Sequence, residues 1–409
     1  MNPLDLVKPG DFYADGWVNL DWLKKALEET CAPNQVAELA VKKLEDDHQK
    51  GVKPKEGFMA SIRRVFVYWK NAEGPIESVV VKIPNVKTAA EAWEKSAALK
   101  SEDLDQHGAR VIAFMHNTES NVYRILGESG LRIPKTFLNR NIGSDDPNEF
   151  PVLVMEDLSK FEIVDVLDGM NEKKLFSVVE FLVDLHFFSF HFDGLQSIGL
   201  TKEQLALLDP INKLVRGICE KLESESPSHF ENLGLVTEHV LEKSDWWGDY
   251  MDMFTGNLRS PKLPAVLAHG DLWTTNVLFE GDVVGGVIDW QLAHPGSPTE
   301  DLQHLLTLCC PVEMRRRLTQ PLLLHYHTRM KEKFEANGEE VPFDFETLKS
   351  LYDKTLPYTV AMSLFATGMW SSSDVILTGK DEQRRLEECY GRSTALVEET
   401  LLLLGVLSQ

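Results

Sequence analysis

The pattern of apolar and polar residues predicts a β-hairpin in the first third of the chain. Residues 62–69 are rich in β-branched and aromatic side chains, and residues 78–83 read Ser-Val-Val-Val-Lys-Ile before a proline that ends the strand. Strand periodicity places Lys82 on the same face as Val80. An ammonium group among apolar neighbours is costly without an anionic partner. Lys82 therefore either binds an anion or, as the alternative, extends to solvent from an edge strand.

Periodic apolar positions further along predict two long helices with a buried strand between them. Apolar side chains recur every three or four positions over about residues 107–127, with Glu119 on or beside the apolar stripe. Residues 151–158 form an apolar run that ends in acidic residues, which predicts a buried strand. The next helix has its apolar positions between residues 175 and 189. It contains His186, which we expect to be a hydrogen-bonded core residue.

The stretch before the hairpin gives weaker signals. We expect a helix from about Leu20 to Asp47, within an N-terminal helical extension at residues 1–50. Between Gly51 and the first strand lies a glycine-containing loop, whose backbone N–H groups are suited, together with Ser61, to hold a phosphate group. An ordinary loop is the alternative for this stretch.

The most informative segment is residues 269–276, which read His-Gly-Asp-Leu-Trp-Thr-Thr-Asn and are followed by Ile-Asp-Trp-Gln at residues 288–291. Short apolar runs predict a strand before this segment, a strand after Asn276, and a hairpin that returns to Asp289. Asn276 and Asp289 are therefore expected at the mouth of one hairpin. Asp301 opens a later predicted helix, where we expect it to cap that helix and to tie down the segment.

Three polar residues in these segments have the chemistry that phosphoryl transfer requires. Transfer from ATP needs a side chain that orients and deprotonates the acceptor hydroxyl, a task that suits Asp271. It also needs oxygen ligands for magnesium, a task that suits Asn276 and Asp289. Because a His-Gly-Asp tripeptide followed by an asparagine also arises by chance, the surrounding strand–loop–hairpin pattern gives the motif its specificity.

Composition and charge narrow the classes of partner. A chain of 409 residues is long enough for two domains, and a formal charge of −22 disfavours nucleic acid and anionic membranes as partners. The five scattered cysteines include no C-x-x-C pair and indicate thiols in a reducing compartment. Neither a signal peptide nor a bilayer-spanning apolar stretch is evident, so we expect a cytoplasmic location. The sequence implies no protein partner.

The His-Gly-Asp loop and the Ile-Asp-Trp segment resemble the catalytic motif of the aminoglycoside phosphotransferase and choline kinase superfamily. Further elements belong to the same pattern: Gly57-Phe-Met, Lys82, Glu119-x-x-x-Tyr123 and Met155-Glu-Asp-Leu158. With these elements, the chain from about residue 50 to 395 is similar to the CHK-kinase-like, or ecdysteroid-kinase-like, family, in particular its nematode branch.

The resemblance implies an α+β, two-lobed protein-kinase-like fold. The N-lobe, residues 51–158, would bind the nucleotide and contain an antiparallel sheet with a bridging helix. The larger, mostly helical C-lobe, residues 159–409, would carry the catalytic loop and the acceptor site. The short run that ends the N-lobe would be the hinge at which the adenine of ATP binds, with Glu156 and Leu158 among its residues.

The activity that the resemblance implies is ATP- and Mg²⁺-dependent phosphorylation of a hydroxyl group on a small molecule. Asp271 would be catalytic, Asn276 and Asp289 would hold Mg²⁺, and Lys82, positioned by Glu119, would bind the α- and β-phosphates. The acceptor would be a small-molecule alcohol. An apolar region at residues 348–370 suits a bulky hydrophobic alcohol such as a steroid-like compound, or is plain helical core.

A second hypothesis is a pseudokinase that binds a nucleotide or a hydrophobic ligand without turnover. The irregular glycine-containing loop favours it. Two carboxylates and an amide at the catalytic positions argue against it, because a non-catalytic fold has little need for them. A protein kinase is disfavoured, since no long activation segment follows residue 291.

Overall fold

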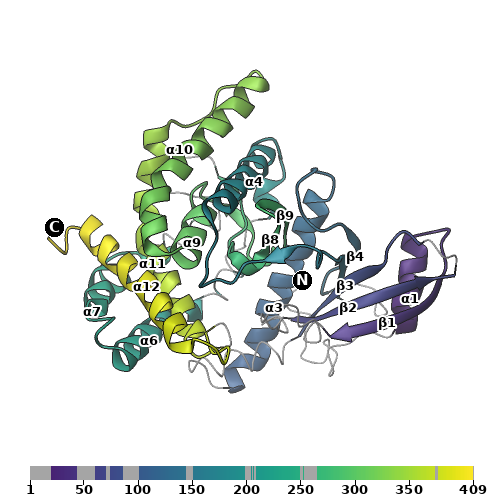
Figure 1. Ribbon diagram of the computed structural model, residues 1–409, viewed down its shortest axis with the longest axis horizontal. Helices are drawn as coiled ribbons and strands as arrows, with labels where there is room; N and C mark the ends of the chain where they lie inside the picture. Colours follow the sequence, from purple (N-terminus) through teal and green to yellow (C-terminus); the bar gives the residue numbers. More distant parts are fainter. Residues whose placement is uncertain are drawn as a thin grey trace. The chain divides into compact units, whose positions relative to one another are not determined.

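The computed structural model divides into two compact units, Met1–Lys160 and Phe161–Gln409. The division falls close to Leu158, where the sequence predicts a boundary between lobes. Figure 1 shows the elements of both units. The structure describes residues 20–43, 60–70, 74–85, 101–143, 151–198, 204, 206, 209–248, 252, 265–373 and 376–408.

The first unit is built on a five-stranded antiparallel sheet with the strand order β1-β2-β3-β5-β4. The predicted hairpin and the predicted buried strand are confirmed as β2, β3 and β5. Val79, Val81 and Ile83 project into the core of this unit, so Lys82 lies on the other face of β3. The strands are β1 (Val36–Lys43), β2 (Ala60–Trp69), β3 (Ser78–Pro84), β4 (Thr136–Arg140) and β5 (Val152–Glu156).

The prediction of one helix over residues 20–47 is wrong for residues 31–43, and residues 44–47 lie outside the described part of the chain. Helix α1 (Leu20–Thr30) ends before Pro33, and Val36–Lys43 forms β1, which pairs with β2. A proline cannot continue the helical hydrogen-bond ladder. The residues after it pair with β2 along a ladder with one irregularity between Val36 and Glu38, and they bury Val36 in the core. The N-terminal stretch is therefore part of the sheet and not only a helical extension.

The predicted long helix is confirmed as α3 (Ser101–Leu126), which begins earlier than its apolar periodicity indicates. It contacts β3 and β4 within the first unit. Its polar side chains bind the end of β4 and the segment after it: the Asn117 amide bonds both backbone groups of Ile142, and Nε2 of the buried His116 lies 2.7 Å from the Arg140 carbonyl oxygen. These contacts fix the face of α3 on which Glu119 is carried.

The second unit contains two small antiparallel sheets and a helical body. The predicted hairpin after Asn276 is confirmed as β8 (Val277–Glu280) and β9 (Val283–Val287), with β6 (Glu162–Ile163) beside β8. The short strand β7 (Val266–Ala268) pairs with β10 (His294–Gly296). Helix α4 (Glu172–Phe190) packs on β7 and β9 with its predicted apolar positions buried.

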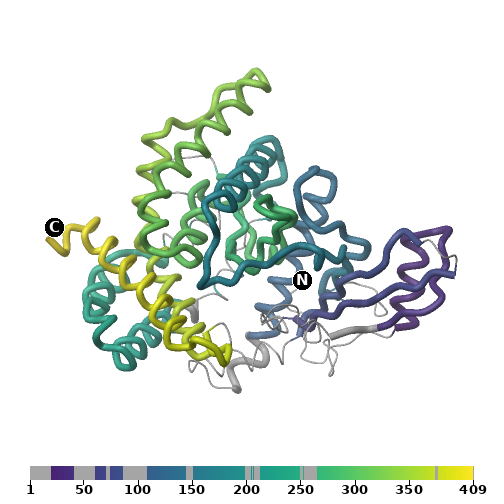
Figure 2. Tube along the Cα trace, viewed as in Figure 1, coloured from purple at the N-terminus to yellow at the C-terminus, as the bar shows by residue number. Residues whose placement is uncertain are grey.

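Helices from distant parts of the sequence pack together in the second unit. Helix α11 contacts α6, α9, α10 and α12, and the traces of α6, α7, α11 and α12 lie side by side in Figure 2. Among the described residues, no helix is long and apolar enough to cross a membrane. The longer helices are α6 (Asp209–Glu225), α9 (Glu300–Cys309), α10 (Val312–Ala336), α11 (Phe345–Trp370) and α12 (Glu382–Leu403). The short ones are η4 (Leu195–Ser197), α7 (Leu233–Val236), η6 (Thr237–Glu242) and η7 (Thr274–Asn276).

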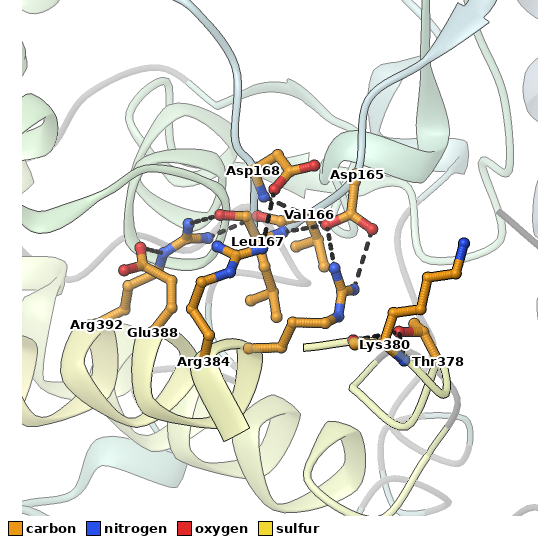
Figure 3. A network of polar contacts seen from close by, with 10 residues as sticks. Asp165, Val166, Leu167, Asp168, Thr378, Lys380, Arg384, Glu388 and Arg392 are labelled. Atoms are coloured by element: carbon orange, nitrogen blue, oxygen red, sulfur yellow. Dashed lines mark hydrogen bonds and ion pairs between the residues drawn. The ribbon is translucent and has the colours of Figure 1, made fainter. Parts of the chain in front are cut away.

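Two arginines of α12 hold the segment that follows β6 (Figure 3). Arg385 forms a two-pronged ion pair with Asp165, at 3.1 and 3.0 Å. Burial alone would raise the pKa of Asp165, but Arg385 and the Leu167 N–H lower it below its ordinary value. The buried guanidinium of Arg392 donates to Glu388 at 2.7 Å and to three backbone oxygens. These belong to Val166, Leu167 and Leu308, at 2.6, 2.7 and 2.8 Å.

Candidate active site

In the first unit, Lys82 and Glu119 form a buried ion pair. Lys82 Nζ on β3 lies 2.7 Å from Glu119 Oε2 on α3, and both side chains are almost fully enclosed. The pairing is the one that the sequence predicts. Since a buried charge needs its partner, Glu119 fixes the ammonium group at one place on the sheet. Binding of phosphate by Lys82 stays a prediction.

The predicted hinge contains a carboxylate, that of Asp157, which is bound to the sheet. Asp157 accepts a hydrogen bond from the Ser78 hydroxyl at 2.6 Å and pairs with Arg64 Nε at 2.8 Å. Burial alone would raise the pKa of Asp157, but the hydrogen bonds from Ser78 and Ser159 and the charge of Arg64 lower it. Asp157 thereby holds in place its neighbours Glu156 and Leu158, whose contact with adenine stays a prediction.

Ser61 lies at the start of β2 and is buried. Its hydroxyl accepts a hydrogen bond from Asn85 Nδ2 at 2.9 Å, which joins the start of β2 to the end of β3. The glycine-containing loop between Gly51 and Gly57 lies outside the described residues. Phosphate binding by Ser61 therefore stays a prediction, with its hydroxyl already engaged in the sheet.

In the second unit, the loop around Asp271 is fixed by hydrogen bonds from three sides. The backbone N–H groups of His269 and Gly270 donate to the two carboxylate oxygens of Asp301, at 2.7 and 3.0 Å. His269 Nε2 donates to the Ile288 carbonyl at 2.9 Å, and its Nδ1 accepts from the Asp271 N–H at 3.2 Å. His269 is therefore a structural residue, as predicted.

Asp301 ties the loop down as predicted, but it does not cap α9. The N-cap position is Thr299, and both Asp301 oxygens accept from the loop because that loop passes over the first turn of the helix. Burial, the largest effect, raises the pKa of Asp301 although both N–H groups lower it. Gly270 is needed here: its φ is +80°, and an added Cβ would lie 2.2 Å from the Leu292 carbonyl oxygen.

Asp271, Asn276 and Asp289 are gathered at the mouth of the hairpin. Asn276 Nδ2 donates to the Asp271 carbonyl oxygen at 2.8 Å and lies 3.4 Å from its carboxylate Oδ2. The Ile288 N–H donates to the Asn276 carbonyl at 3.0 Å, which brings Asp289 beside Asn276. Asp289 has φ +68°, a left-handed conformation that is uncommon outside glycine and concentrates at functional sites.

The donor set fits magnesium. Because the amide nitrogen of Asn276 is directed at Asp271, its amide oxygen and the Asp289 carboxylate are the groups suited to a cation. Both are hard oxygen donors, as Mg²⁺ prefers, and Mg²⁺ binds through few protein ligands, with water and phosphate completing its shell. Among the described residues, no cluster of three or more His, Cys, Asp or Glu forms a metal cage.

Two contacts of the loop around Asp271 are visible only in the structure. His304 Nε2 on α9 lies 3.7 Å from Asp271 Oδ1, and the Trp273 ring stacks on Trp370 with 5.2 Å between centroids. His304 stands one helical turn after Asp301, so helical spacing could have placed it on the same face. No sequence signal pairs Trp273 with Trp370, which lies at the end of α11.

The aromatic and Met-rich part of α11 is divided between core and surface. Tyr358 and Trp370 are buried, whereas Met362, Phe365 and Met369 are half-buried at helical spacing. Farther upstream, Trp246 of the adjacent pair Trp246-Trp247 is buried. A partly accessible apolar stripe on α11 therefore remains, and it ends at Trp370, which stacks on Trp273 in the loop after Asp271.

His186 is a core residue, as predicted. Its Nδ1 lies 2.8 Å from the Tyr326 hydroxyl in the interior of the second unit. Burial lowers the pKa of His186 to about 3, and burial, with the nearby Lys82 charge, lowers that of His116 in the first unit to about 4. Both imidazoles are therefore neutral in the folded chain at neutral pH.

We expect stability to fall as the pH falls from about 6.5, the ordinary histidine pKa, towards 4. In this pH range the histidines of the unfolded chain bind protons, whereas the buried imidazoles stay neutral. The free energy of unfolding therefore falls by about 1.4 kcal/mol per pH unit for each group. Urea unfolding at pH 6.5 and pH 5 measures the loss, and His186→Gln should reduce it. In the control His191→Gln, whose histidine is half-exposed with a raised pKa, the loss should persist. An unchanged slope in His186→Gln would contradict the assignment.

The similarity to known proteins covers most of the chain. A Caenorhabditis elegans protein named "Uncharacterized kinase-like protein D1044.1" is 23% identical over 341 residues, which cover 80% of this chain and 85% of that protein. "Uncharacterized oxidoreductase dhs-27" from the same organism is 25% identical over 337 residues, 76% of this chain. The chain spans 39% of the length of that second relative.

Among solved structures, choline kinase from Cryptosporidium parvum Iowa II superposes with a TM-score of 0.52 and 13% identity, over 95% of this chain and 98% of that chain. At this identity the likeness shows the fold alone, an α+β, two-lobed kinase-like fold, and confirms the predicted fold class. The DUF1679 family model, described as "Uncharacterized oxidoreductase dhs-27", matches residues 39–399. The chain therefore belongs to the DUF1679 family.

Proposed function

We propose that this chain is an ATP- and Mg²⁺-dependent phosphotransferase that phosphorylates a hydroxyl group of a small molecule. The observation that carries the proposal is the grouping of Asp271, Asn276 and Asp289 at the mouth of one hairpin, on a kinase-like fold. We also propose the finer placement in the ecdysteroid-kinase-like branch, on the motifs that the chain shares with it.

Each residue has one task in the proposed mechanism. Asp271 accepts a hydrogen bond from the acceptor hydroxyl, orients its oxygen towards the γ-phosphorus, and takes the proton late in transfer. Asn276 and Asp289 would hold Mg²⁺, which would neutralise charge on the β- and γ-phosphates. Lys82, fixed by Glu119, binds the α- and β-phosphates. The new bond joins the acceptor oxygen to phosphorus as the bond to ADP breaks.

The acceptor that we propose is an alcohol with a bulky apolar body. The support is the half-buried stripe of Met362, Phe365 and Met369 on α11, which leads to the Trp273–Trp370 stack beside the catalytic loop. Flexible thioethers and aromatic rings suit apolar ligands of irregular shape. Phosphorylation of a steroid-like alcohol in preference to choline would support this choice.

The alternative is a protein that binds a nucleotide or a hydrophobic ligand without turnover. The oxidoreductase name of one relative gives no third candidate function for this chain, since the match covers 39% of that protein. The alternative predicts ligand binding but no ADP formation with any alcohol.

The nucleotide site is tested first by unfolding with and without Mg·ATP. We expect Mg·ATP to stabilise the wild type by about 2–4 kcal/mol when its concentration is roughly 100 to 1,000 times the dissociation constant. Asp289→Asn should lose most of this gain, because the amide removes the charge while asparagine tolerates the left-handed backbone.

The matched control is Asp282→Asn, a half-exposed carboxylate in the turn of the same hairpin. It should keep the full gain. No stabilisation of the wild type would defeat the proposed nucleotide site and favour the alternative of a hydrophobic-ligand binding protein.

A further inference from the structure

The carboxylate of Asp271 is contacted at both of its oxygens. Asn276 Nδ2 lies 3.4 Å from Oδ2, and His304 Nε2 lies 3.7 Å from Oδ1. A carboxylate oxygen has two acceptor positions, so both contacts leave room for an acceptor hydroxyl. The two neighbours differ in origin: Asn276 is carried by the catalytic loop itself, whereas His304 is carried by α9.

The elements that carry His304 and Asp271 are rigidly joined. Asp301, one turn before His304 on α9, accepts the N–H groups of His269 and Gly270, so the helix and the loop are fixed to each other at that turn. At the other end of α9, the Leu308 carbonyl is bound by Arg392. These hydrogen bonds hold the His304 backbone in place beside the loop that carries Asp271.

The imidazole of His304 is neither a core group nor a surface group. Its side chain is 21% exposed and that of Asp271 is 28% exposed, so both are within reach of solvent and of a bound molecule. The buried His269 has a protein partner at each ring nitrogen, and the buried His186 has one at Nδ1. The polar contact of the His304 imidazole is with the carboxylate of Asp271.

We propose that His304 is a positioning residue for Asp271, which donates its Nε2–H to Oδ1 and fixes the plane of the carboxylate towards the acceptor hydroxyl. The inference rests on the proposed phosphotransferase function and adds a residue to it. Hydrogen bonds in catalytic sites are often long without substrate and tighten in the reacting complex, so 3.7 Å is a suitable starting distance. A small misplacement of the base is enough to slow transfer strongly.

The kinetic test compares His304→Leu with His304→Gln, whose amide nitrogen stands near the position of Nε2. ADP formation from Mg·ATP is followed with water as the acceptor and with choline, ethanolamine and a steroid alcohol. We expect His304→Leu to lower kcat about 10- to 100-fold with an unchanged KM for Mg·ATP. His304→Gln should restore most of kcat. Equal kcat in wild type and His304→Leu would overturn the inference.

The control is His325→Leu, which removes another half-exposed histidine of the second unit that pairs with a carboxylate, Glu180. It should leave kcat unchanged. Melting temperatures of all variants, with and without Mg·ATP, show whether each one folds and binds nucleotide. A loss of kcat in His325→Leu equal to that in His304→Leu would mean that a general structural role explains both.

A second readout does not depend on turnover. In protein labelled with ¹⁵N-histidine, the imidazole signals of His304 are assigned by their absence in His304→Gln and then compared between wild type and Asp271→Asn. A shift of the His304 Nε2 signal supports the contact, and an unshifted signal overturns it.

The two readouts distinguish the failure of this inference from the failure of the proposed function. If the wild type neither binds Mg·ATP nor forms ADP, the proposed function fails and the role of His304 fails with it, whatever the imidazole signals show. If the wild type forms ADP and the His304 variants do so with the same kcat, the proposed function stands and the role of His304 fails.

Discussion

Asp271→Asn should lower phosphotransfer about 10²- to 10⁴-fold while Mg·ATP binding is retained. This is the usual contribution of a general base, and an asparagine amide cannot take the acceptor's proton. The substitution keeps the size of the side chain, and Asn276 Nδ2 donates mainly to the backbone carbonyl of residue 271, which the change preserves. The loss should therefore appear in kcat and leave the nucleotide site intact.

The measurement is ADP formation together with the thermal shift by Mg·ATP. Asp282→Asn, on the same hairpin but at its turn, is the control and should retain full activity. Activity of Asp271→Asn equal to that of the wild type would remove Asp271 from the mechanism. Loss of both turnover and nucleotide binding would instead show that Asp271 contributes to holding Mg·ATP.

Arg392→Leu should destabilise the chain by about 3–5 kcal/mol, the usual result of removing one partner from a buried ionic network. Arg392 is 3% exposed and donates to the Glu388 carboxylate and to the carbonyls of Val166 and Leu167 (Figure 3). It also donates to the Leu308 carbonyl. Leucine fills much of the volume but donates no hydrogen bond. It leaves buried oxygens without a donor, each at a cost of about 1–3 kcal/mol.

Arg384→Leu is the matched control on the same helix. Its side chain is 58% exposed and meets the exposed Asp168 at 3.5 Å, a surface pair worth about 0–1 kcal/mol. Urea unfolding of both variants compares them directly. Equal, small losses would show that water replaces Arg392, and that α12 does not hold the segment after β6 in the way that the contacts indicate.

The main elements of the fold were predictable because their signals are local. Strand alternation marks β2 and β3, and helical periodicity marks α3 and α4, since both reflect neighbours within a few residues. The cost of burying an ammonium group indicated that Lys82 needs an anionic partner, and the family resemblance implied that this partner is Glu119. β1 was missed because its ladder with β2 is a non-local pairing, and Val36 gains its burial only from the assembled sheet.

By itself, the sequence determined which residues have the chemistry of the site, and in which order they follow along the chain. Asp271, Asn276 and Asp289 are joined by one loop and one hairpin, so local geometry brings them together. Only the tertiary structure decided what holds that loop. His304 meets Asp271 from a separate helix, and Arg392 binds Val166 across 226 residues. Such contacts depend on how whole elements pack, which no local periodicity encodes.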